Sequence, residues 1–226
     1  MSRVAVIIPA LNEAGAIGDV VAEIRATVDA EVIVVDNGSQ DQTATVARRA
    51  GAVVVTCPER GYGKACLRGI AEARGNDVLV FIDGDGSMPA VDIPALVGPI
   101  LDGRADIVCG ARRADPGTMP AHQRWGNRLS MALLRSLYGV RLSDLGPFRA
   151  VRATTLASLA MRASKFAWPA EMLARAAKVQ ARIIEVPVGY RARAAGRSKV
   201  GGTLRGSIGA GMGIVGSLAW VRMLPR

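Results

Sequence analysis

Short runs of β-branched and other apolar residues recur along the first half of the chain, at residues 4–8, 31–35, 52–56, 78–82 and 106–110. Each run except the last is followed by a segment in which apolar residues have helical spacing. Nearly continuous apolar strands that alternate with helices are typical of a parallel sheet covered on both faces. The pattern therefore predicts an α/β fold with a mostly parallel sheet flanked by helices.

Two local signals mark helix starts within this half. Ser39, followed three residues later by Gln42, matches the spacing of a capping box ahead of the second expected helix. Pro89 lies near the start of a later helix, which is expected to bury Ile93 and Val97. Both signals agree with the alternation of strands and helices.

The pattern changes after residue 110. A connection rich in Pro, Gly and Arg precedes expected helices over roughly residues 122–138, 152–162 and 169–178, and a last strand is expected over residues 182–190. No internal repeat or low-complexity tract interrupts this order. The expected strand is followed by a basic loop.

The C-terminal stretch 207–221 is apolar on all sides, lies between Arg205 and Arg222, and is too short to span a bilayer comfortably. It is predicted either to lie at a membrane interface or to pack on its own domain or another subunit. We therefore divide the chain into a main domain over residues 1–203 and a C-terminal apolar helix within residues 204–226.

Charge is distributed unevenly. Residues 1–110 contain 9 Lys and Arg against 15 Asp and Glu, a net charge of −6, whereas residues 111–226 contain 20 against 4, a net charge of +16. The strongly basic second half favours phosphates, nucleic acid or an anionic membrane as partners. Nucleic acid is disfavoured, because the chain has only nine aromatic residues and no recognisable nucleic-acid motif.

Other residue types exclude whole classes of site. Cys57, Cys66 and Cys109 are odd in number and lack paired short spacing, so we expect reduced, buried thiols rather than disulfides or a zinc knuckle. The only histidine, His122, excludes histidine metal clusters and histidine-based triads.

The aromatic side chains Trp125, Phe166 and Trp168 are expected to serve packing. No apolar run reaches the length of about eighteen residues that marks a membrane-spanning helix, and Pro9 and Asn12 interrupt the N-terminal run too early for a signal peptide. We therefore expect a cytoplasmic protein.

Ligands of such sheets bind beyond the carboxyl ends of the strands. The segments that follow the first four runs are unusually polar, and they comprise residues 9–13, 36–41, 59–64 and 83–85. Any one of them is explained equally well by turn or cap chemistry and by a functional role. Four such polar segments at one edge of a sheet together indicate a binding or catalytic site.

Common nucleotide and metal motifs do not fit these segments. A phosphate loop around Lys64 would require a serine or threonine where Ala65 stands, and a dinucleotide motif would require glycine at Cys66. A calcium loop that started at Asp83 would require glycine and glutamate where the chain has Met88 and Pro94. A nucleotide must be held differently if it binds here.

Asp83 and Asp85 offer another reading. Two residues apart at the end of a strand, they are expected to point to the same side. Mg²⁺ and Mn²⁺ are commonly bound by one or two carboxylates together with the oxygens of a diphosphate. Asp36, at the end of the second strand, is placed to meet a base or ribose. We therefore expect a divalent cation that holds a diphosphate.

Five segments in order, VAVIIPALNEAGAI, VVDNGSQDQT, RGYGKACLRGIAEARG, FIDGDGS and SDLGPFRA, resemble the family-2 glycosyltransferases of the GT-A fold. The resemblance covers roughly residues 3–203 and is greatest to dolichyl-phosphate mannose and glucose synthases. It implies a nucleotide-diphospho-sugar donor, a divalent metal, Mg²⁺ or Mn²⁺, and inversion at the anomeric carbon.

The resemblance also implies roles for single residues. Asp83 and Asp85 match the metal-binding Asp-x-Asp motif, although Gly84 replaces the usual alanine and Ser87 stands where some synthases have a third metal ligand. Lys64 is expected near the base and ribose. The residues that match the nucleotide pocket are Pro9, Leu11, Asn12, Glu13, Asp36 and Asn37.

Basic residues of the second half match the acceptor side of the synthases. Arg112 and Arg124 match residues that the synthases use around the acceptor phosphate. Arg197, Ser198 and Lys199 resemble the late basic loop of the synthases, which closes over their site.

Asp144 is one of only four acidic residues after residue 110. It is a candidate for a general base or for holding an acceptor or an arginine, the alternative being a cap or loop residue. A phosphate acceptor would need no strong base, because its second pKa is about 6, whereas a hydroxyl acceptor would need one.

The favoured function is transfer of a hexose from a UDP- or GDP-sugar to a polyprenyl phosphate by a peripheral protein at the cytoplasmic face of the membrane. Two alternatives are the same chemistry with a soluble hydroxyl acceptor, and a non-catalytic nucleotide-sugar-binding protein. A soluble hydroxyl acceptor would not explain the basic second half or the apolar C-terminal stretch. The presence of Lys64, Asp83 and Asp85 argues against a non-catalytic protein.

Overall fold

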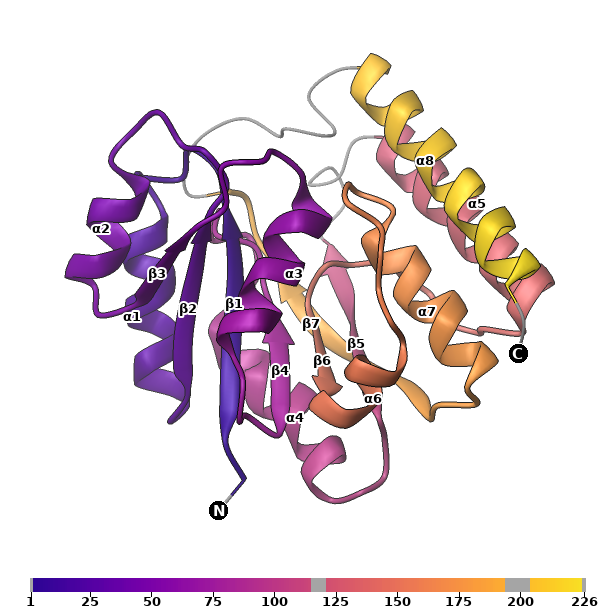
Figure 1. The fold of residues 1–226 in the computed structure, drawn as a ribbon, viewed down its shortest axis with the longest axis horizontal. Coiled ribbons are helices and arrows are strands. Elements are labelled where there is room, and N and C mark those ends of the chain that lie inside the picture. Colours follow the sequence, from indigo (N-terminus) through magenta and orange to yellow (C-terminus); the bar gives the residue numbers. More distant parts are fainter. Residues whose placement is uncertain (1, 115–120, 194–203, 225–226) are drawn as a thin grey trace.

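The computed structural model describes residues 2–114, 121–193 and 204–224. Within them a seven-stranded sheet has the order β3-β2-β1-β4-β6-β5-β7 (Figure 1). Its strands are β1 (Val4–Ala10), β2 (Glu31–Asp36), β3 (Val53–Thr56), β4 (Val78–Phe81), β5 (Ile107–Ala114), β6 (Arg149–Arg152) and β7 (Ile183–Tyr190). The predicted mostly parallel sheet is confirmed, since only β6 runs antiparallel, between β4 and β5.

Helices cover both faces of this sheet (Figure 1). One face carries α1 (Ile17–Thr27), α2 (Thr43–Arg49) and α4 (Ile93–Leu101), the last entered through a 3₁₀ turn, η1 (Ala90–Asp92). The other face carries α3 (Tyr62–Glu72), α5 (Ala121–Tyr138), α6 (Ala153–Ser158), α7 (Trp168–Lys178) and α8 (Leu204–Met223).

Side chains of each strand alternate between the two hydrophobic cores. In β1, Ala5 and Ile7 enter the core under α3 and α7, whereas Val6 and Ile8 enter the core under α1 and α4. This alternation follows from the two-residue period of a strand and explains why the central strands are apolar without interruption. Such burial contributes about 25 cal/mol per Å² of apolar surface.

Three details of the second half differ from expectation. Strand β6 was not anticipated, because its four residues contain a single β-branched side chain, Val151. The helix expected over residues 152–162 is shortened to α6, which ends at Ser158. Trp168 is fully buried as expected, but Trp125 is 71% exposed on α5, so the packing role expected for it is wrong.

The C-terminal helix α8 packs along α5 and α7. Leu218 and Val221 enter the core, Trp220 stacks under the guanidinium of Arg175, and Arg222 donates to the carbonyl of Leu137 on α5. Among the described residues, no helix is both long and apolar enough to cross a membrane.

Candidate active site

The sheet gathers the predicted site residues at one edge. Strands β1, β2, β4, β5 and β7 all end there, because they are mutually parallel. The antiparallel β6 begins at the same edge, since its first residue, Arg149, pairs with Phe81 at the end of β4. The loop ahead of β6, which contains Asp144, is thereby brought to the ends of the other strands.

The loops after β1 and β2 are joined by hydrogen bonds. Asn12, in the left-handed region with a φ of 52°, donates its amide to the hydroxyl of Ser39 at 3.0 Å and accepts from the amide of Gln40 at 2.7 Å. Ser39 in turn donates its amide to Asp36 at 2.9 Å. The predicted capping box is wrong, because the Ser39 hydroxyl serves the neighbouring loop and no side chain caps α2. Asn12 and Asp36 therefore lie in one cross-linked segment.

The third loop is anchored by Asn37. Its side-chain amide donates to the carbonyls of Cys57 and Glu59 and accepts from the amide of Gly61, at 2.8–2.9 Å. Lys64, in the first turn of α3, forms an ion pair with Glu59. Asn37, predicted as a pocket residue, thus also holds the segment that presents Lys64.

Asp83 and Asp85 lie in the turn just beyond β4, not on the strand itself, which ends at Phe81. Asp85 is nearly fully buried; one carboxylate oxygen accepts from the amide of Ser87 at 2.9 Å, and the other lies 3.1 Å from Nε of Arg193. Burial and the neighbouring Asp85 raise the pKa of Asp83 to about 7, against the opposing charges of Arg193 and Arg112.

Glu13 also belongs to this cluster, because its charge contributes to the raised pKa of Asp83. Its side chain is buried, and its backbone amide donates to the hydroxyl of Thr43 at 2.8 Å. Residues from the ends of β1, β4, β5 and β7 therefore share one electrostatic environment.

Arg112, on β5, forms a bidentate pair with Asp144. Nε and Nη2 each lie 2.7 Å from one oxygen of the carboxylate, and the Arg112 amide donates to it at 3.1 Å. Burial opposes the charge of Arg112, but the hydrogen bonds and charge of Asp144 outweigh it and raise the arginine's pKa above its usual value. Of the roles predicted for Asp144, holding an arginine is the one that the structure contains.

The remaining predicted residues are placed as follows. Pro9 and Leu11 are half-buried at the end of β1, and Arg124 is exposed near the start of α5. Arg197, Ser198 and Lys199 lie outside the described residues. Arg193 was missed by sequence reasoning, and its only signal was the pair of alternating arginines directly after the last strand.

The two aspartates are chemically suited to a divalent cation. The guanidinium of Arg193 already pairs with Asp85 and its charge acts on Asp83, and their loop follows a strand that is buried on both faces. No cluster of three or more His, Cys, Asp or Glu side chains able to hold a metal is found among the described residues. A cation here would therefore have Asp83 and Asp85 as protein ligands and would need further oxygens from a substrate.

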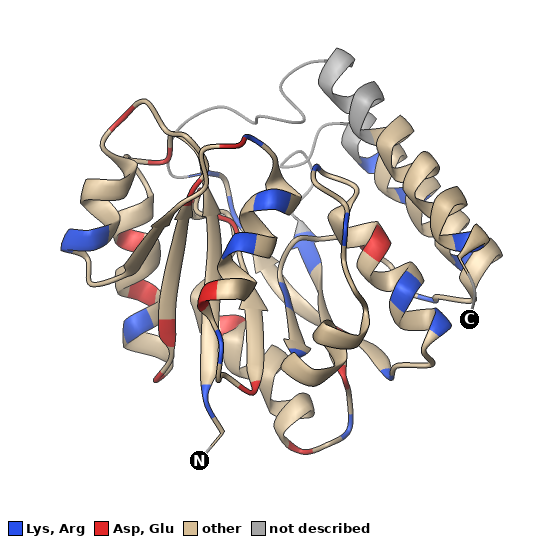
Figure 2. Cartoon of the chain, viewed as in Figure 1, with Lys and Arg blue, Asp and Glu red and all other residues tan. Residues whose placement is uncertain are grey.

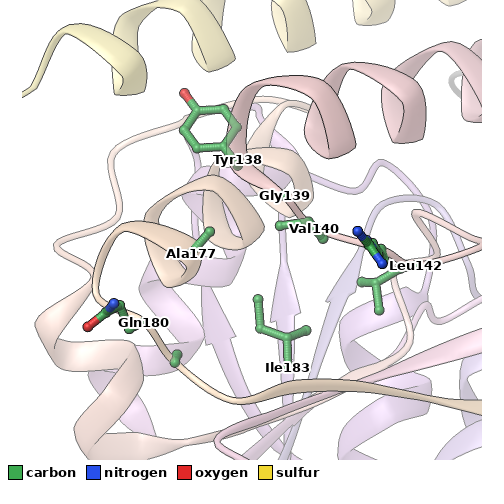
Figure 3. Close-up of a pocket in the computed structure, with 9 residues that line it drawn as sticks. Tyr138, Gly139, Val140, Leu142, Ala177, Gln180 and Ile183 are labelled. Atoms are coloured by element: carbon green, nitrogen blue, oxygen red, sulfur yellow. The ribbon is translucent and has the colours of Figure 1, made fainter.

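A hollow of about 350 Å³ lies elsewhere, where α5 and α7 end (Figure 3). Tyr138, Val140, Gln180 and Ile183 contribute to its lining. Ile183 is the first residue of β7, so the hollow is at the opposite end of that strand from Arg193. None of the predicted site residues lines it.

A sequence model of the family described as Glycosyl transferase family 2 matches residues 5–156, which include both aspartates and the Arg112–Asp144 pair. The chain belongs to this glycosyltransferase family. An uncharacterised glycosyltransferase of Mycobacterium tuberculosis is 41% identical over 209 residues, covering 91% of this chain and 93% of the relative. An undecaprenyl-phosphate mannosyltransferase of Micrococcus luteus is 31% identical over 220 residues, 90% of each chain.

Solved structures agree with this assignment. One is glucosyl-3-phosphoglycerate synthase from Mycobacterium tuberculosis in complex with Mn²⁺, UDP and phosphoglyceric acid. The superposition covers 100% of this glycosyltransferase and 80% of the synthase chain, with a TM-score of 0.82 and 28% sequence identity. Another structure of that synthase contains Mg²⁺ and UDP. The protein is therefore a family-2 glycosyltransferase of the GT-A fold.

Proposed function

We propose that this enzyme transfers a hexose from a nucleotide-diphospho-sugar to a phosphorylated acceptor, with inversion at the anomeric carbon. The observation that carries the proposal is the convergence of Asp83 and Asp85 with Arg112 and Arg193 at one edge of the sheet. Carboxylates there suit a metal-bound diphosphate, and arginines suit phosphate groups. These carboxylates and arginines are the charged groups that such a transfer needs.

The donor is assigned to the cross-linked loops after β1, β2 and β3. Asp36, held by Ser39, is placed to accept hydrogen bonds from a ribose or base, and Lys64 lies at the start of α3. The predicted neighbours Pro9, Leu11, Asn12, Glu13 and Asn37 belong to the same loops. The synthase from Mycobacterium tuberculosis binds UDP-glucose, which supports a UDP-sugar over a GDP-sugar.

Mg²⁺ or Mn²⁺ would be held by Asp83 and Asp85, and when bound it would neutralise the charge that develops on the leaving diphosphate. The protein itself holds these ligands in place. The buried turn after β4 holds the carboxylate of Asp85, which accepts a hydrogen bond from the backbone amide of Ser87. Fixed ligands need no reorganisation during the reaction.

On the acceptor side, Arg112 is oriented by Asp144 and Arg124 is assigned to the same phosphate. A phosphate oxygen is already nucleophilic near neutral pH, so no general base is required. With both carboxylate oxygens bonded to Arg112, Asp144 acts by orienting that guanidinium. The late loop with Arg197, Ser198 and Lys199 is proposed to close over this region.

Two acceptors of this kind are supported by relatives. The relative from Micrococcus luteus is described as an undecaprenyl-phosphate mannosyltransferase, and the structural neighbour contains phosphoglyceric acid. We favour a polyprenyl phosphate, presented at a membrane surface by a peripherally bound enzyme. A soluble phosphorylated acceptor is the second candidate, and it needs no membrane contact.

The outer face of α5 and α8 supports the membrane-bound acceptor. The two helices lie side by side (Figure 1), and Arg222 of α8 donates to Leu137 of α5. Away from the core, Trp125 and Leu129 on α5 are 71% and 59% exposed, and Met212 and Met223 on α8 are 70% and 76% exposed.

These two helices are also basic. The sequences of α5 and α8 contain five arginines and no acidic residue, and in Figure 2 their described parts carry no acidic segment. Exposed apolar side chains among arginines suit the interface of an anionic bilayer, where they enter the headgroup region and the arginines meet lipid charges. We therefore assign the domain of residues 1–203 to catalysis and the helix within 204–226 to membrane contact, together with α5.

Incubation of the purified enzyme with labelled UDP- and GDP-sugars and Mn²⁺ tests the proposal. One arm contains a polyprenyl phosphate and the other contains phosphoglycerate. Label in the organic phase supports the polyprenyl acceptor, and label on phosphoglycerate alone supports the soluble one. Binding of sugar nucleotides without transfer to either acceptor would contradict both.

Membrane contact is tested by co-sedimentation with vesicles that contain anionic lipid. The double variant W125S/L129S is expected to lose most of the binding, whereas V91S/L101S, which changes exposed apolar residues on the opposite side of the sheet, is expected to retain it. Binding should weaken as salt rises from about 0.05 to 0.5 M. If W125S/L129S binds the vesicles as well as V91S/L101S does, α5 does not contribute to membrane contact.

A further inference from the structure

Arg193 lies where a cation is expected. Its Nε is 3.1 Å from one carboxylate oxygen of Asp85, and the other oxygen of Asp85 accepts from the amide of Ser87. Both oxygens of the proposed metal ligand are therefore engaged by groups of the protein. A divalent cation that binds to the same oxygen must compete with the guanidinium.

The guanidinium acts on both aspartates. Arg193 contributes the largest favourable charge to Asp83, ahead of Arg112. Two carboxylates at the end of a buried strand repel one another, and the positive charge paired with Asp85 offsets part of that repulsion. Arg193 thus supplies, without a metal, part of the positive charge that a divalent cation would place beside the pair.

Arg191 anchors the segment that carries Arg193. Its amide donates to the carbonyl of Ser87 at 2.9 Å, its Nε to the carbonyl of Gly86 at 2.7 Å, and its Nη2 to Glu23 at 2.5 Å. These bonds fix the backbone at the end of β7 against the turn that contains Asp85. The Arg193 side chain remains 30% exposed, so it can leave Asp85 by rotation of its own torsions while these bonds persist.

We propose that Arg193 is a positioning residue that occupies the cation site in the metal-free enzyme and moves onto the donor diphosphate when the metal binds. This inference rests on the proposed function, since it takes the donor and metal from there. A divalent cation and a guanidinium on the same carboxylate repel one another, whereas a diphosphate beside the cation offers the displaced guanidinium new anionic oxygens.

The consequence is a coupling between metal and nucleotide. The metal alone must displace Arg193 into solvent, so it binds weakly. With UDP present, the displaced guanidinium pairs with phosphate oxygens, so each ligand strengthens the binding of the other by the same factor. Without Arg193, the metal alone should bind better and the coupling should shrink.

Titration with Mn²⁺, followed by electron paramagnetic resonance of the free ion, measures this coupling with and without saturating UDP. For the wild type, we expect UDP to tighten Mn²⁺ binding by about 10- to 100-fold, within the usual range of such couplings. For Arg193→Gln, Mn²⁺ alone should bind about tenfold tighter than in the wild type, and the effect of UDP should fall below about fivefold.

Arg113→Gln is the matched control for loss of one positive charge at this edge. Arg113 follows Arg112 on β5, so its side chain points to the other face of the sheet, and it is exposed. It should leave both Mn²⁺ constants within about twofold of the wild type. Unchanged or weaker Mn²⁺ binding by Arg193→Gln, or an equal gain in Arg113→Gln, would overturn the inference.

This measurement separates the inference from the proposed function. An enzyme that shows the expected Mn²⁺ and UDP coupling but transfers sugar to neither acceptor would refute the function and keep the role of Arg193. Transfer with a polyprenyl phosphate, but with the same coupling in the wild type and in Arg193→Gln, would refute the role of Arg193 alone.

Discussion

Asp144 holds the guanidinium of Arg112 through two hydrogen bonds of 2.7 Å, although 32 residues separate the two in the chain. Both side chains are largely buried, and Gly146 lies so close that an added Cβ would come within 3.2 Å of the carboxylate. A planar bidentate pair in such a confined place fixes the direction of the arginine. The role of Asp144 therefore depends on Arg112.

Asp144→Asn tests this dependence. The amide cannot accept two charged hydrogen bonds, so Arg112 should lose its fixed direction, and the KM for the phosphorylated acceptor should rise about 10- to 100-fold. Donor affinity, measured by calorimetry with UDP, should stay within about threefold of the wild type. The shape of the pH profile of kcat should not change. Loss of a titrating limb from that profile would instead assign Asp144 as a general base.

Asp85→Asn removes one charge from the proposed metal site and keeps the shape of the side chain. We expect Mn²⁺ affinity to fall at least tenfold and kcat to fall by about two orders of magnitude or more. Far-UV circular dichroism should be unchanged. Asp102→Asn, at an exposed position after α4, is the control and should behave as the wild type. A variant at Asp85 with wild-type activity that still requires metal would refute the assignment.

The start of α3 depends on two glycines. Gly61 has a φ of 148°, and a Cβ on Gly63 would lie 1.9 Å from the carbonyl oxygen of Ala163. Gly63→Ala must therefore push α3 away from that loop, at a cost of about 1–3 kcal/mol in the free energy of unfolding. Because Lys64 follows directly, donor binding should weaken as well.

Gly98→Ala is the matched control for this substitution. Gly98 lies inside α4, and an added Cβ would meet no atom within 4 Å. Alanine is a better helix former than glycine by about 1 kcal/mol, so this variant should be as stable as the wild type or more stable. Urea denaturation of both variants measures the difference. Equal stabilities would show that α3 shifts without strain.

Asp106 ties the start of β5 to the segment before β7. It accepts from the guanidinium and the amide of Arg182 at 2.8–3.0 Å, and these hydrogen bonds lower its pKa from 3.8 to about 2. Since the folded-state pKa lies below the unfolded value, the carboxylate stabilises the fold above about pH 4, and this contribution is lost as the pH falls toward 2.

Asp106→Asn should therefore lower the free energy of unfolding by about 1 kcal/mol at pH 7, a small value because Arg182 is half-exposed. The difference between variant and wild type should be constant from pH 8 to 5 and should shrink between pH 4 and 3. Urea denaturation across this range gives the comparison. A difference that grows as the pH falls would contradict the sign of the pKa shift.

The order of elements and the chemistry at the strand ends could be predicted from the sequence. β1, β2 and β4 are buried on both faces, so their apolar runs are nearly continuous and easily recognised. Asp36, Asp83 and Asp85 follow these runs directly, and parallel strands must place such residues at one edge. Local pattern and position in the chain determine these features, and no distant contact is needed to infer them.

The tertiary structure decided which partners these residues meet. The strand β6 is short and weakly apolar, yet its antiparallel insertion between β4 and β5 brings Asp144 to Arg112. The contact between Arg193 and Asp85 likewise depends on where β7 joins the sheet, and the exposure of Trp125 depends on how α8 packs beside α5. Such pairings are set by the packing of segments far apart in the chain, which no local pattern specifies.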